Sequence, residues 1–228
     1  MRDNALLAAL PRGELIRLRP HLQAISLAPK RFLLPAGEPL ACAYFLRSGL
    51  VCLVVPVASG ASVEVAAVGR EGMLGVSLVL ESDPPPYEMT CQVSGEALCV
   101  PAATFTQLVQ ELPVFRRLLL RYALGLLHEV ARSAACSGLH SVEERMALWL
   151  LLWRDRVGAE TFPVTHDVLA RMLGVGRPFV TQIARGLQEA GLIRYERGVV
   201  QILNSRGLEA VACEDYRAVE GHYALLRT

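Results

Sequence analysis

The chain has 228 residues, 53% of them hydrophobic, and a formal net charge of +1. This composition excludes a disordered chain, and the length is enough for one large domain or two small ones. The net charge is too small to indicate a nucleic-acid partner. Only the local distribution of charge along the chain can show whether one segment is suited to bind nucleic acid.

The N-terminal segment lacks the basic start and apolar run of a signal peptide. Apolar stretches are interrupted before they reach the roughly 18 residues of a membrane span. We therefore predict a soluble, cytoplasmic protein without a membrane partner.

The six cysteines are Cys42, Cys52, Cys91, Cys99, Cys136 and Cys213. No CxxC pair and no histidine at zinc spacing is apparent, so we predict no metal site. In a reducing cytoplasm these cysteines are interpreted as small buried hydrophobes, with a redox sensor as the alternative.

The first part of the chain changes from a helical to a strand pattern. Leucines over residues 5–25 have a loose helical spacing, interrupted by Pro11 and Pro20, which predicts short helices. Short β-prone runs then follow at 44–46, 50–57, 63–68, 89–93 and 97–100. Ser59-Gly60 is a hairpin signal, and the prolines at 84–86 require a loop. Strands at this spacing predict a compact antiparallel barrel or sandwich.

A long helix is predicted from Pro113 to Gly138. Two neighbouring apolar stripes follow it, namely Leu119, Ala123, Leu126 and Val130, and Leu120, Leu124, Leu127 and Ala131. The first stripe has the spacing of a coiled-coil seam, and we predict it as a homodimer interface. A helix with two apolar faces must bury both, so the other face is expected on the strand domain. A central helix buried within a monomer is the alternative, and the pattern alone leaves open which face is the seam.

The segment after this helix predicts two helices joined by a tight turn. Ser141 and Glu144 have the spacing of a capping box, and residues 158–163 are expected to form a turn. Thr165 can cap a helix that ends at Gly174, where glycine permits a positive φ, and Pro178 suits the first turn of the next helix. The apolar positions are Leu169, Leu173, Val180, Ile183 and Leu187. This arrangement is typical of a helix-turn-helix.

The polar positions of the second helix indicate contact with DNA bases. Arg177, Thr181, Gln182 and Arg185 share one face. Arginine can bind guanine and glutamine can bind adenine through two hydrogen bonds each, whereas the alternative is a merely solvated face. Two strands around 196–198 predict a wing, whose Arg194 and Arg197 could reach phosphates. Between Thr165 and Arg206 there are six arginines against three acidic residues, the sign that phosphate contact requires.

Together these segments resemble the CRP/FNR family of bacterial transcription regulators, and residues 69–75 resemble the glycine turns of its β-roll. The resemblance implies an α+β fold. It consists of a cyclic-nucleotide-binding-type jelly roll (residues 1–112), a dimerisation helix (113–138) and a winged helix-turn-helix (139–228). It also implies a homodimer on a two-fold symmetric DNA operator, with RNA polymerase as a further partner. Arg177 matches the family's guanine-reading arginine and Gln182 a second base-contacting position, while Thr165 and His166 match positions that contact the DNA backbone.

The sequence also departs from the family's pattern. Pro178 stands where relatives have glutamate, so the usual operator sequence does not follow. Members that bind cyclic AMP carry a glutamate and an Arg-Ser pair where this chain has Val76 and Tyr87-Glu88. An apolar residue and a carboxylate cannot hold a phosphate anion. We therefore predict no cyclic AMP, and no cofactor or effector can be named.

An enzyme is the least consistent reading, because no nucleophile elbow, metalloprotease motif or phosphate loop is present and no catalytic residue can be assigned. A small-molecule or redox sensor that acts by protein contact, with a degenerate DNA module, remains the alternative to a DNA-binding regulator.

Overall fold

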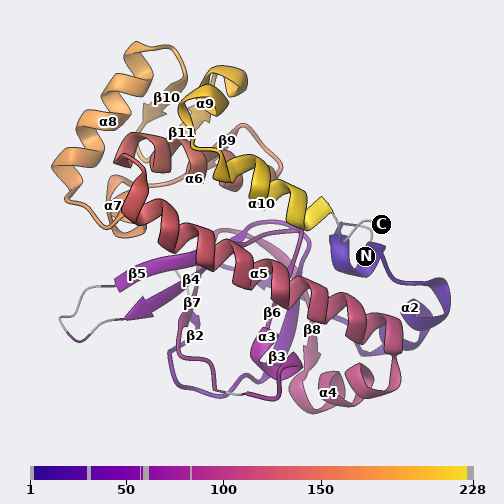
Figure 1. The fold of residues 1–228 in the computed structure, drawn as a ribbon. Coiled ribbons are helices and arrows are strands. Elements are labelled where there is room, and N and C mark those ends of the chain that lie inside the picture. The colour runs from indigo at the N-terminus through magenta and orange to yellow at the C-terminus, as the bar shows by residue number, and fades with distance from the viewer. Residues whose placement is uncertain (1–2, 30–31, 57, 59–61, 83, 225–228) are drawn as a thin grey trace.

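The computed structural model describes residues 3–29, 32–56, 58, 62–82 and 84–224. A strand-rich domain and a helical domain lie on either side of one long helix, α5 (Pro113–Leu139) (Figure 1). The strand domain begins with α1 (Ala5–Ala8), α2 (Arg12–Leu18) and the 3-10 turn η1 (Arg19–His21). These elements confirm the short helices expected over residues 5–25, except that the last residues of that range belong to strand β1 (Gln23–Leu27).

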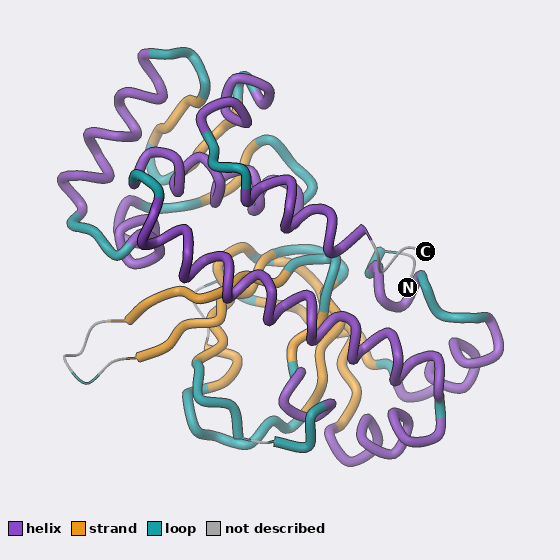
Figure 2. The backbone as a smooth tube through the Cα atoms, viewed as in Figure 1, coloured by secondary structure: helices purple, strands orange, loops and turns teal. Residues whose placement is uncertain are grey.

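Two antiparallel four-stranded sheets form the β-roll (Figure 2). Their orders are β1-β8-β3-β6 and β2-β7-β4-β5. The remaining strands are β2 (Phe32–Leu34), β3 (Cys42–Leu46), β4 (Leu50–Pro56), β5 (Ser62–Val68), β6 (Met73–Leu74), β7 (Glu88–Val93) and β8 (Gly95–Pro101). All five predicted strands are present, and the prolines at 84–86 lie in a loop. The predicted turn at Ser59-Gly60 lies outside the described residues.

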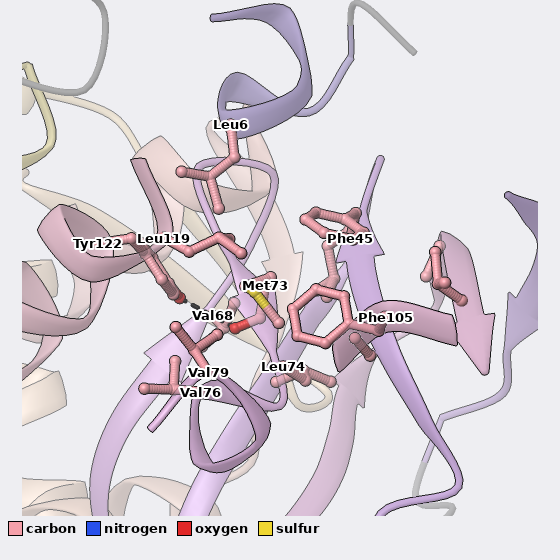
Figure 3. Close-up of a cluster of buried hydrophobic side chains, with 14 of the residues drawn as sticks. Leu6, Phe45, Val68, Met73, Leu74, Val76, Val79, Phe105, Leu119 and Tyr122 are labelled. Carbon is pink, nitrogen blue, oxygen red and sulfur yellow. Dashed lines mark hydrogen bonds between the residues drawn. The ribbon is translucent and has the colours of Figure 1, made fainter. Parts of the chain in front are cut away.

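The core of the β-roll also takes in the helices packed against it. Helices α3 (Val76–Val79) and α4 (Ala102–Glu111) contribute apolar side chains, and the rings of Phe45, Phe105 and Phe115 contact one another with centroids 5.9–6.3 Å apart. Tyr122 of α5 is fully buried, and its hydroxyl donates to the carbonyl oxygen of Met73 (3.2 Å) (Figure 3). One end of α5 is therefore an integral part of the strand-rich domain.

Helix α5 begins at a proline, where a missing N–H is harmless. Two of its free N-terminal amides, those of Val114 and Phe115, donate to the carboxylate of Glu14 in α2 (3.0 and 2.7 Å). A negative side chain at this position also interacts favourably with the helix dipole. The helix continues one residue past the predicted end at Gly138.

The stripe predicted as the dimer interface faces the β-roll instead. Leu119 is 0% exposed and points into the apolar cluster of the β-roll (Figure 3). Leu126 is buried in the same cluster, with Ala123 and Val130 half-buried against it. The assignment of Leu119, Ala123, Leu126 and Val130 to a dimer interface is therefore wrong. The neighbouring stripe is the exposed one: Leu120, Leu124 and Leu127 are 42%, 52% and 61% exposed. Adjacent residues on a helix differ by about 100°, so burying one stripe exposes the other.

The C-terminal domain begins with α6 (Val142–Val157), which starts with the predicted capping box between Ser141 and Glu144. Helices α7 (His166–Leu173) and α8 (Arg177–Glu189) follow, then β10 (Ile193–Glu196), β11 (Val199–Ile202), α9 (Ser205–Val211) and α10 (Asp215–Ala224). Residues 161–163, expected in a turn, form a third strand, β9 (Thr161–Pro163), which pairs with β11. The segment after the wing forms two helices, α9 and α10.

The two domains are joined by a shared apolar cluster and by buried ion pairs. Leu50 and Ala67 of the β-roll belong to the same cluster as the core of the C-terminal domain. Arg156 of α6 is almost fully buried, and its guanidinium lies 2.6 Å from the Glu129 carboxylate and 3.3 Å from that of Glu71. Breaking such a buried network is costly, so the pairing favours one defined domain arrangement.

Among the helices that the structure describes, none combines the length and the hydropathy needed to cross a bilayer.

Candidate nucleic-acid interface

The two helices that form the candidate site are positioned by local signals. The Thr165 hydroxyl accepts a hydrogen bond from the amide of Val168 (3.3 Å) and thereby caps α7. Gly174 ends α7 with φ +67°, a conformation that favours glycine, and Pro178 lies in the first turn of α8. Four of the five predicted apolar positions are buried and Ile183 is half-buried. The helix-turn-helix is therefore built as the sequence indicates.

The predicted reading residues lie on the solvent side of α8. Arg177, Thr181, Gln182 and Arg185 are all exposed, whereas Val180, Ala184 and Leu187 on the opposite side are buried. Figure 1 shows α8 at the edge of the molecule, with open space on its outer side. A helix about 10–12 Å wide with this exposure fits the major groove of B-DNA, which is roughly 12 Å wide.

Two of the exposed arginines have acidic neighbours. The Arg177 Nη1 lies 3.6 Å from an Asp167 carboxylate oxygen, and the Arg185 Nε donates to Glu189 (2.8 Å). Both pairs are solvent-exposed, where an ion pair contributes less than about 1 kcal/mol. Such pairs can be exchanged for contacts with nucleic acid.

His166 has a different environment from the one expected of a phosphate-contacting residue. Its ring stacks on Tyr195 of β10 (centroids 4.3 Å apart, interplanar angle 19°), and its Nδ1 lies 3.0 Å from the Thr181 hydroxyl. Burial, with a contribution from Arg177, lowers the pKa of His166, so the imidazole is neutral at pH 7. This geometry links α7, α8 and the wing. Contact of Thr165 and His166 with the DNA backbone remains a prediction.

The wing is the hairpin of β10 and β11, with Arg194 on β10 and Arg197 at its tip, both exposed. Arg197 has φ +51° and Gly198 has φ +77°. Two consecutive positive φ angles are typical of a type I′ hairpin turn, which favours asparagine or glycine. An arginine at the first of these positions is strained, and such strain frequently accompanies function.

Two features of the region were missed by sequence reasoning. Phe179, in the first turn of α8, is largely exposed beside the reading face. The six cysteines, interpreted as small buried hydrophobes, include Cys136 and Cys213, whose Sγ atoms are 3.5 Å apart. The Nδ1 atom of His140 lies 3.3 Å from the Sγ of Cys136. The statement that no histidine has ligand spacing is therefore wrong. Cys136 and His140 are four residues apart on a helix, the spacing that places two side chains on one face.

The positions that bind cyclic AMP in relatives lie at or near the interior of the β-roll. Val76 is buried in the apolar cluster with Val79 and Tyr122 (Figure 3). Tyr87 is half-buried against the same cluster, and Glu88 begins β7. These side chains offer apolar surface and a carboxylate.

Comparisons with known proteins agree with this architecture. Residues 24–112 match the family model of the cyclic nucleotide-binding domain, and residues 144–211 match that of the Crp-like helix-turn-helix domain. The cyclic AMP receptor protein of Thermus thermophilus is 24% identical over 191 residues, which cover 80% of this chain and 88% of the relative.

Solved structures share the fold at low sequence identity. FixK2 from Bradyrhizobium japonicum has a TM-score of 0.72 at 17% identity, covering 84% of this chain and 98% of that protein. A transcriptional regulator of the CRP/FNR family from Thermus thermophilus has a TM-score of 0.65 at 22% identity, covering 83% and 98%. The two family models together match more than half of the chain, in the order that the fold displays. The chain belongs to the CRP/FNR family of transcription regulators.

Proposed function

We propose that this chain works as a homodimer that reads a two-fold symmetric DNA operator with helix α8 of each subunit. The observation that carries the proposal is the grouping of Arg177, Thr181, Gln182 and Arg185 on the exposed side of a helix whose other side is buried. Family membership supports DNA as the partner, and the cytoplasm and contact with RNA polymerase follow from the same membership as expectations.

Each reading residue has a chemical role in the proposal. Arg177, in the first turn, presents its guanidinium to the O6 and N7 atoms of guanine, and Gln182 presents an amide that matches adenine. The Thr181 hydroxyl donates to the carbonyl oxygen of Arg177 (3.0 Å), which keeps its methyl group available for apolar contact with a base. Arg185 lies one turn further along and contacts either a base edge or a phosphate.

Contacts with the DNA backbone come from both sides of α8. The capped N-terminus of α7 at Thr165 offers free amides to a phosphate, as helix N-termini commonly do. Arg194 and Arg197 supply charge from the wing. Such contacts position the protein on DNA without reading the sequence, and they make binding depend on salt.

The exposed stripe of α5 supplies the proposed dimer seam. Leu120, Leu124 and Leu127 form a row along the helix that no described part of the chain covers. Pairing this row with that of a second copy removes apolar surface from water, which stabilises the dimer by about 25 cal/mol for each Å² of apolar surface buried. It also sets two α8 helices in successive major grooves, roughly 34 Å apart.

The effector of the β-roll is proposed to differ from cyclic AMP. The apolar surroundings of Val76 and the carboxylate of Glu88 do not suit a cyclic phosphate. A ligand or partner that shifts α5 would alter the spacing of the two reading helices. Whether the regulator activates or represses depends on where its operator lies.

The substitution Arg177→Ala tests the proposal directly. Operators selected from genomic fragments would be titrated with wild-type and variant protein by fluorescence anisotropy. We expect a loss of about 1–3 kcal/mol and relaxed preference at one position of each half-site. Arg206→Ala, an exposed arginine on α9, serves as a control of equal charge change. Unchanged affinity and specificity of Arg177→Ala would refute the role of α8.

A further inference from the structure

Four side chains with metal-ligating atoms meet where the long helix ends. Cys136 lies in the last turn of α5 and His140 follows that helix directly. Asp215 is the first residue of α10 and Cys213 lies two residues before it, more than seventy residues further along the chain. One ligand atom from each of the four lies within 4.8 Å of every other. A grouping of two thiols, an imidazole and a carboxylate is a donor set typical of zinc.

The distances are close to those of a tetrahedral site. The two Sγ atoms are 3.5 Å apart, the Cys136 Sγ is 3.3 Å from the His140 Nδ1, and the Cys213 Sγ is 4.0 Å from an Asp215 oxygen. Zinc bonds of about 2.3 Å to sulfur and about 2.0 Å to nitrogen place tetrahedral ligands roughly 3.5–3.8 Å apart. These three pairs are already close to such spacings, and the other pairs lie within 4.8 Å, so the four side chains would have to draw together to enclose an ion.

The remaining atoms of two ligands already have outer partners. The other ring nitrogen of His140, Nε2, lies 3.4 Å from the Glu214 carboxylate, and the second oxygen of Asp215 accepts a hydrogen bond from Arg132. Metal-ligating histidines usually donate their second nitrogen to a carboxylate in this way, which fixes the ring and its tautomer. Glu214 and Arg132 are therefore placed to orient the two ligands His140 and Asp215.

The surroundings of the cluster suit an enclosed ion. Cys136, Cys213 and Asp215 are buried, and a small cavity of about 20 Å³ lined by Cys136 and Asp215 lies beside them. Two thiolates and one carboxylate around Zn²⁺ leave one net negative charge. Arg132 and Arg145 line the same cavity, and they can balance that charge.

We propose that Cys136, His140, Cys213 and Asp215 form a structural zinc site. Four protein ligands leave no open position, as in structural rather than catalytic sites. Binding releases the two thiol protons and joins the end of α5 to the start of α10. Because α5 carries the proposed dimer seam and α10 belongs to the DNA-binding domain, the ion would hold the two at a fixed angle.

Metal binding is tested on the full chain, reduced and stripped with a chelator. Co²⁺ is added as a spectroscopic probe, and Zn²⁺ is then titrated against a chromophoric chelator. We expect one ion per chain, ligand-field and thiolate charge-transfer bands of tetrahedral cobalt, and displacement of cobalt by zinc. Zn²⁺ should also raise the melting temperature, since an ion that binds only the folded state stabilises it.

Variants assign the individual ligands. Cys136→Ser and Cys213→Ser should each weaken the thiolate bands and zinc binding, and the double variant should abolish the bands. Glu214→Gln should weaken zinc binding about 10–100-fold. Cys42→Ser, a half-buried cysteine of β3, is the matched control and should bind like wild type. No stoichiometric binding by reduced wild type, or thiolate bands of unchanged intensity in Cys136→Ser, would overturn the proposal. So would a native Cys136–Cys213 disulfide, which mass spectrometry detects. DNA affinity measured on the stripped protein separates this outcome from failure of the operator-binding proposal.

Discussion

The Nη1 atom of Arg177 lies 3.6 Å from a carboxylate oxygen of Asp167, so the residue of α8 that we propose to read guanine has an acidic neighbour in α7. The pair joins the two helices of the motif across their exposed side. In the free protein it orients the guanidinium. In a complex, however, the same carboxylate would lie near DNA phosphates and weaken binding.

Asp167→Asn should therefore raise DNA affinity severalfold, and more at low salt than at high salt, because exposed charges are screened. It should also cost up to about 1 kcal/mol of stability, since an acidic residue in the first helical turn interacts favourably with the dipole. Anisotropy titrations over a range of salt concentrations measure the first effect and thermal melts the second. Glu38→Gln, an exposed acid of the β-roll, is the control. A lower affinity for Asp167→Asn would show that orientation of Arg177 outweighs repulsion.

Arg197→Asn separates function from stability at the wing tip. Asparagine tolerates the positive φ of this position better than arginine, so the variant should be at least as stable as wild type. It should nevertheless bind DNA less tightly. The slope of log K against log salt should fall in magnitude by about 0.9 for each lost phosphate contact, or about 1.8 for a dimer that loses one contact per subunit. An unchanged slope would place Arg197 outside the interface.

Leu124→Glu tests the dimer seam. A carboxylate in the middle of the exposed row should be tolerated by the monomer, because Leu124 is 52% exposed, but it should prevent two apolar rows from pairing. Sedimentation equilibrium should give a dimer for wild type and a monomer for the variant. Leu203→Glu, at a position with 48% exposure in the other domain, should remain dimeric. A monomeric wild-type protein at micromolar concentration would contradict the seam.

The buried carboxyl group of Glu64 should make the stability of the folded protein depend on pH. Its carboxyl is buried between β5 and the C-terminal domain, one oxygen having no hydrogen-bond partner among the described residues, and burial raises its pKa to about 8. Cys52, Arg156 and Arg171 oppose this increase, and Glu129 adds to it.

The folded state thus binds more protons than the unfolded state between about pH 4.5 and about pH 8, and stability falls as the pH rises through this window. Glu64→Gln should flatten the dependence and raise the melting temperature above about pH 8 relative to wild type. The melting temperatures of wild type and variant would be measured across this pH range. Parallel plots of melting temperature against pH for the two proteins would contradict the raised pKa of Glu64.

Local signals predicted much of the fold, and the remainder depended on tertiary contacts. The cap at Thr165, the positive φ at Gly174 and the proline in α8 all act within a few residues, so the helix-turn-helix could be read directly. Strand β9 has only three residues, and its identity depends on pairing with β11. Such a segment has no periodicity of its own.

The two errors at the candidate sites have the same physical origin. Leu119 and Leu120 are equally apolar neighbours, and only the position of the β-roll decides which of them is covered. Cys136 and His140 form a readable pair, but Cys213 joins them through the packing of α10 on α5, across 77 residues of sequence. Spacing alone therefore identifies half of the proposed zinc site.

Selection of duplexes from a randomised pool by the purified full chain tests the central claim most directly. If α8 reads DNA as part of a dimer, the selected sequences should share two inverted half-sites with centres about 10 base pairs apart. Arg177→Ala should lose the preference at one position in each half-site. Selection that enriches no sequence, or enriches an asymmetric one that Arg177→Ala selects equally well, would contradict the account.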